Sequence, residues 1–243
     1  MSDAYRTDLA YIHDAGYGKF AEHAAPVLLR HLQRAGIKSG RVIDLGCGSG
    51  ILAQHVRAEG FEVVGVDTSP AMIALARKRV PGARFTAASF VDLVLPPCVA
   101  VAAIGEVLNY CFDPDNSDAA IRRIFRRVFN ALCPGGLFLF DIAEPGRAPR
   151  GVHQHCRQAD DWAVLVEKRE DCKRRLLTRT ITTFRRIGKQ YRRDEETHVQ
   201  RLLRRGDVIR WLRAIGFRVQ TLRGYGPVRF PLGWTGIAAR KPN

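Results

Sequence analysis

The chain has 243 residues, of which 46% are apolar, so it is long enough to bury a core of its own. This length fits one α/β domain with an elaboration or a small cap. No apolar run approaches the roughly 20 residues that cross a bilayer, and the start lacks the pattern of a secretion signal. Six cysteines lie far apart without a Cys-x-x-Cys pair, which predicts reduced thiols in a cytoplasmic protein rather than disulfides or zinc.

Most of the net charge of +15 comes from one stretch of the chain. Residues 150–223 hold 20 Lys or Arg against 9 Asp or Glu. Such a surplus suits a nucleic-acid or anionic ligand. However, Arg outnumbers Lys 32 to 7 throughout the chain, which favours an arginine-rich composition with the charge spread over the surface. Nucleic-acid binding is therefore possible but not the favoured interpretation.

Two helices are predicted before the first strand. Residues 8–13 and 24–32 have helical spacing, with Pro26 suited to the first turn of the second helix and Gly36 to its end. Between them, residues 14–20 combine aromatic side chains with two glycines, and we expect this stretch to be flexible.

Residues 41–50 read as a short buried strand that breaks into three glycines at alternate positions. Helical spacing resumes at residues 51–59. A strand, a glycine turn and a helix in this order form a nucleotide-binding corner, because glycine lets the backbone approach a ligand closely. The third glycine, Gly50, comes one residue earlier than in a dinucleotide fingerprint. Asp44, two residues before Gly46, is unusual for an anion site and sensible for a cationic ligand.

The second strand, residues 61–67, ends in Asp67, 21 positions after Gly46. In nucleotide-binding α/β folds, an acid at this strand end reaches the ribose hydroxyls. Ser69 and Pro70 then begin a helix, as an N-cap and a first-turn proline.

The stretch Asp-Leu-Gly-Cys-Gly-Ser-Gly at residues 44–50, together with Asp67, resembles the class I S-adenosylmethionine-dependent methyltransferases. The resemblance implies an α/β fold with a Rossmann-like, seven-stranded, mostly parallel sheet whose last strand is antiparallel. It implies S-adenosyl-L-methionine as cofactor, bound by Asp44, Gly46, Cys47, Gly48, Asp67, Thr68, Met72, Ser89, Phe90, Gly105 and Tyr17. Core packing is the more usual role for a Met at helical spacing, as Met72 is. Ser89 stands where the family often has an Asp near the adenine, and Asp92 is a second option for that acid.

Further strands are predicted at residues 83–88 and 98–104, and at 137–141 after a Pro-Gly-Gly turn, with a helix at 119–132. In open α/β sheets, ligands bind beyond the carboxyl ends of the strands. The resemblance therefore implies substrate-binding roles at Tyr11, Phe20, Asn109 and Tyr110. The aromatic residues of this set are also compatible with simple packing onto the sheet.

Residues 144–203 interrupt the alternation of helix and strand. Residues 162–168, 175–185 and 191–203 are β-rich, which predicts an antiparallel insertion of three or four strands that caps the site. A helix at 206–216 and strands at 217–222 and 233–241 complete the expected sheet. The predicted organisation is thus a helical lid (1–40), a cofactor-binding core (41–143 and 204–243) and a β-rich cap (144–203).

The leading hypothesis is methyl transfer to an N or O atom of a small metabolite by a monomer or homodimer. Methylation of RNA or protein through the basic cap, and a non-catalytic cofactor-binding protein, are the alternatives. An oxygen acceptor needs a general base, for which His198, Glu106 and His13 are the candidates. No metal is expected, because His153, His155 and Cys156 lack a fourth ligand at suitable spacing.

Overall fold

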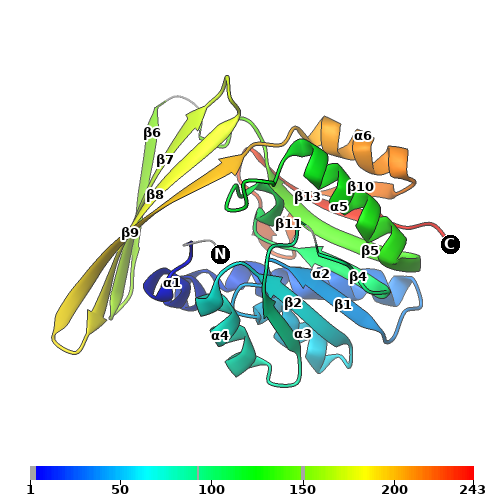
Figure 1. The fold of residues 1–243 in the computed structure, drawn as a ribbon, viewed down its shortest axis with the longest axis horizontal. Helices are drawn as coiled ribbons and strands as arrows, with labels where there is room; N and C mark the ends of the chain where they lie inside the picture. The colour runs from blue at the N-terminus through cyan, green and yellow to red at the C-terminus, as the bar shows by residue number, and fades with distance from the viewer. Residues whose placement is uncertain (1–3, 92, 149–150) are drawn as a thin grey trace.

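A seven-stranded sheet organises the core of the computed structural model, which describes residues 4–91, 93–148 and 151–243 (Figure 1). The strand order is β10-β13-β5-β4-β1-β2-β3, with β13 antiparallel to both of its neighbours. This order confirms the predicted fold class. The strands are β1 (Arg41–Leu45), β2 (Glu62–Asp67), β3 (Arg84–Ala87), β4 (Cys98–Ala103), β5 (Leu132–Ala143), β10 (Arg218–Leu222) and β13 (Trp234–Arg240). A two-stranded ribbon, made of β11 (Gly224–Tyr225) and β12 (Val228–Arg229), lies between β10 and β13 in the sequence.

The sheet is apolar on both faces because helices cover both. The helices are α1 (Thr7–Tyr17), α2 (Lys19–Arg34), α3 (Ile51–Ala58), α4 (Pro70–Arg79), α5 (Asp118–Ala131) and α6 (Arg205–Ile215), with a 3-10 turn η1 (Val107–Asn109). Successive strand side chains point to opposite faces. Leu137 and Leu139 of β5 accordingly pack with α2, α3 and α4, whereas Phe138 and Phe140 pack with α5 and α6.

Local sequence signals set several helix starts. The Ser69 hydroxyl accepts a hydrogen bond from the backbone N–H of Met72 at 3.2 Å, and the Ser117 hydroxyl accepts one from that of Ala120 at 3.1 Å. Each serine satisfies one of the four free N–H groups that every helix start leaves. The predicted N-cap serine and first-turn proline of α4 are therefore confirmed.

The N-terminal helices differ from their predicted bounds. The aromatic stretch expected to be flexible is helical, and only Gly18 separates α1 from α2. Pro26 lies inside α2 rather than in its first turn. Its missing N–H costs one helical hydrogen bond. The helix continues through this point because Ala25, Val27 and Leu28 are buried against the sheet.

A separate antiparallel sheet of four strands lies between β5 and α6 in the sequence, within residues 144–203 (Figure 1). Its strands are β6 (Val152–Gln158), β7 (Trp162–Asp171), β8 (Leu176–Ile187) and β9 (Gln190–Arg201). We call this sheet the cap. Strand β6 had no predicted counterpart, since every one of its residues is exposed and the strand carries no apolar alternation. The bounds of the three predicted units remain a proposal.

Helix α1 packs against the inner face of the cap. Leu9 and Ile12 form an apolar cluster with Trp162, Val164 and Ile181 of the cap strands. At the edge of this cluster the buried carboxylate of Asp8 binds the guanidinium groups of two cap arginines, at 3.2 Å for Arg185 and 2.5 Å for Arg192. Together these contacts fasten the N-terminal helix to the cap.

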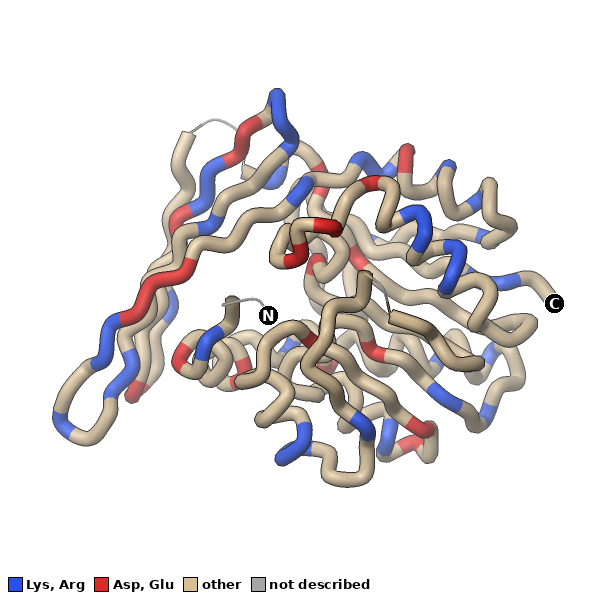
Figure 2. Tube along the Cα trace, viewed as in Figure 1, with Lys and Arg blue, Asp and Glu red and all other residues tan. Residues whose placement is uncertain are grey.

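Lys and Arg residues occur along the cap strands and in the outer turn between β8 and β9 (Figure 2). An acidic segment, residues 194–196, interrupts them in the middle of β9. No helix among the described residues is long and apolar enough to cross a membrane.

Candidate functional site

The glycine loop between β1 and α3 has the backbone form that its sequence predicts. Gly46, Gly48 and Gly50 have φ values of 64°, 52° and 78°. These angles lie in the left-handed region that glycine adopts without steric cost. At the end of β2, the two carboxylate oxygens of Asp67 accept hydrogen bonds from the backbone N–H groups of Gly48 and Ser69, each at 2.9 Å. The loop and the β2 carboxylate therefore form one rigid corner.

Asp44 lies beneath this loop and is only 2% exposed. One of its carboxylate oxygens, Oδ2, has no hydrogen-bond partner within the described part of the chain. Burial, and to a lesser degree the neighbouring Asp67 carboxylate, raise the pKa of Asp44 to about 8. An unpaired buried carboxylate of this kind is stabilised when a cation comes close to it.

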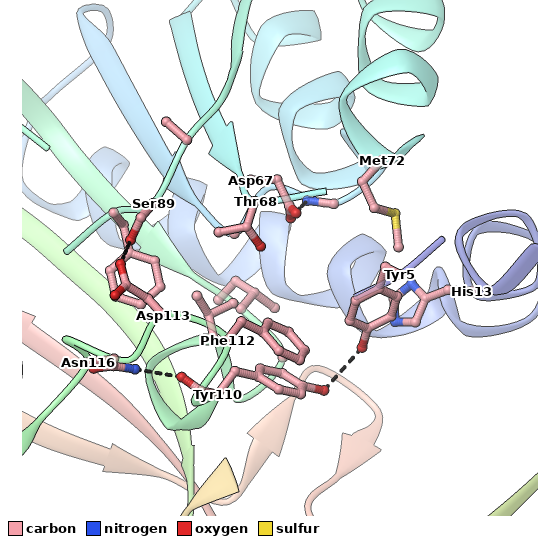
Figure 3. Close-up of a pocket in the computed structure, with 17 residues that line it drawn as sticks. Tyr5, His13, Asp67, Thr68, Met72, Ser89, Tyr110, Phe112, Asp113 and Asn116 are labelled. Atoms are coloured by element: carbon pink, nitrogen blue, oxygen red, sulfur yellow. Dashed lines mark hydrogen bonds between the residues drawn. The ribbon is translucent and has the colours of Figure 1, made fainter. Parts of the chain in front are cut away.

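A first cavity of about 110 Å³ opens at the carboxyl ends of β1, β2 and β3 (Figure 3). Asp67 and Thr68 lie between two groups of side chains, with Ser89 and Asp113 at one end and Tyr5 and His13 at the other. The Ser89 hydroxyl donates to Asp113 Oδ2 at 2.5 Å. Asp113 thus brings a carboxylate to the place where the sequence has serine instead of the expected acid.

The N-terminal segment closes over this cavity. The carboxylate of Glu196 on β9 accepts hydrogen bonds from the backbone N–H groups of Tyr5 at 2.6 Å and Arg6 at 2.8 Å. The Ser69 hydroxyl donates to the carbonyl oxygen of Tyr5 at 2.8 Å, and the hydroxyls of Tyr5 and Tyr110 lie 3.1 Å apart. Tyr5 is therefore held by α4, by the cap and by the loop after β4 at once.

A second, larger cavity of about 390 Å³ lies between the core, α1 and the cap. It shares lining residues with the first, namely Tyr5, His13, Gly46, Gly48, Ile104, Gly105 and Tyr110. A Cβ atom placed on Gly105 would meet nothing within 4 Å, so the backbone here borders open space. The two cavities thus meet over the turn that follows β4.

The buried carboxylate of Asp141, on β5, holds the backbone of this turn in place. Its carboxylate accepts hydrogen bonds from the backbone N–H groups of Gly105 at 2.9 Å and Glu106 at 2.7 Å, and from the indole of Trp234 at 2.8 Å. Burial raises the pKa of Asp141 to about 7, although these donors act in the opposite direction. Glu106 itself has a φ of 60°, which is uncommon outside glycine and turns its side chain toward the cap.

Glu106 lines the second cavity and forms two ion pairs there. Its carboxylate binds Arg147 at 3.0 Å and Arg179 of β8 at 2.5 Å. Burial alone would raise the pKa of Glu106, but the two guanidinium groups outweigh it and lower the pKa to about 2. A carboxylate with so low a pKa is a poor proton acceptor, which argues against Glu106 as the general base.

His13 is the candidate base that reaches both cavities. Its ring stacks on Tyr17 at a centroid distance of 5.6 Å and meets Tyr5 edge-on at 5.3 Å. Burial lowers the pKa of His13 to about 4, so the imidazole is neutral at neutral pH. A neutral imidazole keeps one nitrogen lone pair available for a proton, and the lowered pKa makes it a weaker base than a free histidine.

Most of the predicted site residues lie at these cavities. Five of the predicted residues line the first cavity but not the second, namely Asp67, Thr68, Met72, Ser89 and Phe90. Four others line the second cavity but not the first, namely Cys47, Tyr17, Phe20 and Glu106. His13, Gly46, Gly48, Gly105 and Tyr110 line both, and Asp44 lies below the glycine loop. Asp92 lies outside the described residues.

Besides Asp44, three predicted residues line neither cavity. The hydroxyl of Tyr11 donates to Asp161 at 2.7 Å, on the side of α1 that meets the cap. Asn109 is fully buried, and its amide group donates to the carbonyl oxygens of Ala143 and Arg201. His198 is buried behind the cavity wall and pairs with Glu196 at 2.8 Å. We therefore leave these residues out of the proposed site.

Several lining residues have no counterpart in the sequence predictions, among them Tyr5, Phe112, Asp113, Arg147, Lys168, Arg179 and Trp234. Most come from the lid and the cap, where no local motif marks them. One signal was present in β7, since Val164, Val166 and Lys168 alternate and therefore share a face. In the chain segments that the structure describes, no group of three or more His, Cys, Asp or Glu side chains is placed to hold a metal ion.

Comparison with known proteins agrees with this geometry. A family model described as a methyltransferase domain matches residues 20–222. A trans-aconitate 2-methyltransferase of Acidovorax sp. is 31% identical over 60% of this chain and 56% of its own length. The chain spans about half the length of most of the curated relatives it matches.

Solved structures show the same fold. An S-adenosylmethionine-dependent methyltransferase from Clostridium acetobutylicum superposes with a TM-score of 0.79 at 20% identity, over 96% of this chain and 98% of that one. An amino pentose methyltransferase from Micromonospora echinaspora superposes with a TM-score of 0.74 at 23% identity, over 95% and 96%. At these identities the structures establish the fold, while the family model covers most of the chain. The chain belongs to the methyltransferase domain family.

Proposed function

We propose that the protein binds S-adenosylmethionine in the first cavity and transfers its methyl group to a small molecule held in the second. The observation that carries this proposal is the meeting of the two cavities over Gly105, between His13 and Tyr110. A donor and an acceptor that lie on either side of this point are close and aligned, and alignment alone is worth roughly 7–11 kcal/mol of a reaction barrier.

The residues present fit this cofactor at three places. The Asp67 carboxylate suits the two ribose hydroxyls, since a charged acceptor strengthens both hydrogen bonds. Ser89 and Asp113 suit the polar edge of an adenine, and Tyr110 and Phe112, whose rings stack at 4.6 Å, form an apolar wall beside it. The unpaired oxygen of Asp44 suits the ammonium group of the methionyl end.

The bound cofactor supplies an electrophilic methyl group on a sulfonium. The chain therefore needs to position the acceptor, exclude water and remove a proton. Tyr5, whose backbone is held by hydrogen bonds to Glu196 and Ser69, covers the first cavity. We assign proton removal from an oxygen acceptor to His13 because it lies where the two cavities meet, whereas two arginines occupy the carboxylate of Glu106 and His198 lines neither cavity.

A small acceptor fits the size and enclosure of the second cavity, about 390 Å³ under the cap. Relatives named as acting on trans-aconitate and on an amino pentose have small acceptors as well. An RNA or protein substrate is less well supported, because cap arginines form ion pairs within the molecule. Arg185 and Arg192 bind Asp8, and Arg193 binds Glu195 at 2.7 Å.

Calorimetry with S-adenosylmethionine tests the proposed donor site. We expect the Asp67→Ala variant to bind the cofactor at least a hundredfold more weakly than the unchanged protein, because two charge-assisted hydrogen bonds are lost. Asp160→Ala, which removes an exposed carboxylate of the cap, is the matched control and should leave the affinity unchanged. Equal affinity in both variants would overturn the site assignment.

Turnover separates the enzyme from a non-catalytic cofactor-binding protein. A screen of metabolite extracts with a labelled methyl donor should yield a methylated product. With that acceptor, His13→Gln should lower kcat by about a hundredfold or more if the acceptor atom is an oxygen. A kcat within twofold of the unchanged protein would exclude His13 as the base, and cofactor binding without any labelled product would support the non-catalytic alternative.

A further inference from the structure

Two strands of the cap form one wall of the second cavity. Val164, Val166 and Lys168 of β7 and Arg179 and Ile181 of β8 line it. The strands pair antiparallel, and the register places Lys168 directly opposite Arg179. The wall therefore consists of an apolar part, nearer α1, and a part where two cationic side chains stand side by side.

Like charges that face each other across a strand pair are destabilising. Arg179 has a counter-charge in Glu106, but that single carboxylate is shared with Arg147. Lys168 is half-buried, and no carboxylate lies within ion-pair distance of it in the described ranges of the chain. Three cationic side chains thus face one carboxylate, which leaves a positive surplus in the cavity.

The environment of Lys168 and Arg179 shows that this surplus is not relieved within the protein. Burial, followed by the charges of Arg179 and Arg147, lowers the pKa of Lys168 to about 8. The Nε–H of Arg179 is buried and has no acceptor within the part of the chain that the structure covers. A buried donor without an acceptor costs roughly 1–3 kcal/mol. A ligand oxygen would supply the partner that the Lys168 ammonium group and the Nε–H of Arg179 lack.

Building on the proposed function, we propose that the methyl acceptor carries an oxyanion, a carboxylate or a phosphate, which Lys168 and Arg179 bind at the cap wall. The apolar residues Leu9, Val164 and Ile181 then contact the carbon skeleton of the acceptor. Lys168 acts as a point charge and Arg179 as a directional donor. The negative charge of the acceptor offsets the positive surplus that Lys168, Arg179 and Arg147 leave around Glu106.

The carboxylate of the cofactor's methionyl end is the competing occupant, because the second cavity also borders Gly46 and Gly48. The two occupants differ in a measurable way. If Lys168 binds the acceptor, its removal leaves cofactor affinity unchanged. If Lys168 binds the methionyl carboxylate, its removal weakens the cofactor itself.

The experiment is calorimetry on the full chain saturated with S-adenosylhomocysteine, with citrate, inorganic phosphate and neutral glucose as probes. We expect citrate or phosphate to bind and glucose not to bind. Lys168→Gln should weaken the oxyanion at least tenfold, and Lys168→Arg should restore most of the affinity. Lys189→Gln, which removes an exposed lysine of the β8–β9 turn, is the control and should bind as the unchanged protein does.

Each outcome decides the proposal. Binding of citrate but not phosphate identifies a carboxylate acceptor, and the reverse identifies a phosphate. Failure of both oxyanions to bind, or equal binding by Lys168→Gln, overturns the proposal while leaving the proposed function intact. A matching loss of S-adenosylhomocysteine affinity in Lys168→Gln assigns the lysine to the cofactor and also overturns it. No binding of S-adenosylhomocysteine by the unchanged protein defeats the proposed function, and this inference with it.

Discussion

The core sheet and the cap sheet differ in how deeply their strands are buried and in the side chains that they present. In β1 of the core, four of five residues are buried, whereas all seven residues of β6 in the cap are exposed. The core strands end in a glycine loop and short acids that suit any nucleoside. The inner face of the cap instead presents an apolar patch beside two cations. Under the proposed function, the core selects the methyl donor and the cap selects the acceptor.

Glu106 joins the two regions, and its removal should have the largest effect. Glu106→Ala leaves Arg147 and Arg179 buried without a counter-charge, which costs about 3–5 kcal/mol of unfolding free energy. Denaturant unfolding measures this loss. The control Glu167→Ala breaks an exposed pair with Arg169 and should change stability by less than about 1 kcal/mol. Equal stability of the two variants would mean that the cap does not depend on this link.

Asp113 tests the donor side of the comparison. Its carboxylate accepts a hydrogen bond from Ser89 at the end of the first cavity that lies opposite Tyr5 and His13. Asp113→Ala should weaken S-adenosylmethionine about tenfold, the effect of losing a charged acceptor. Asp115→Ala removes an exposed neighbour and serves as the control. Weakened oxyanion binding with unchanged cofactor affinity would contradict the division between core and cap.

The smallest effect is a pH dependence of cofactor binding that comes from the core alone. Burial raises the pKa of Asp44 to about 8, so its carboxyl is mostly protonated at pH 6. A cationic ligand favours the ionised form and lowers this pKa, so binding releases a proton and the affinity rises from pH 6 to 7.5. Calorimetry in two buffers of different ionisation enthalpy measures that proton. Asp44→Asn should abolish the release, and a release that persists in this variant would assign it to another group.

The sequence predicted the core far better than the proposed acceptor site. Residues 44–50 and Asp67 lie within short motifs whose spacing reflects one strand, one turn and one helix, so local rules were sufficient. The cap wall depends on the pairing of β7 with β8 and on Glu106, which is 73 residues from Arg179. No local spacing records such a contact.

Two errors in the lid have the same origin. Pro26 is a helix-start signal, yet burial of its neighbours extends α2 beyond it. Tyr11 has the right residue type for a substrate contact, but α1 turns it toward Asp161 of the cap. In both cases tertiary packing overrode a correct local signal, because the partner lies in a distant part of the chain.

The cap leaves the core and returns to it at almost the same point. The backbone N–H of Leu203, just after β9, donates to the carbonyl oxygen of Ala143, the last residue of β5, at 2.9 Å. A segment whose two ends are this close spans no distance in the core, so its length and sequence are free to vary without moving β5 or α6. The architecture therefore lends itself to exchange of the whole insertion as one module. We expect a chimaera with a different four-stranded insertion between these two residues to keep its donor site and to acquire a new acceptor range, provided that the insertion supplies partners for Glu106 and for the backbone of Tyr5.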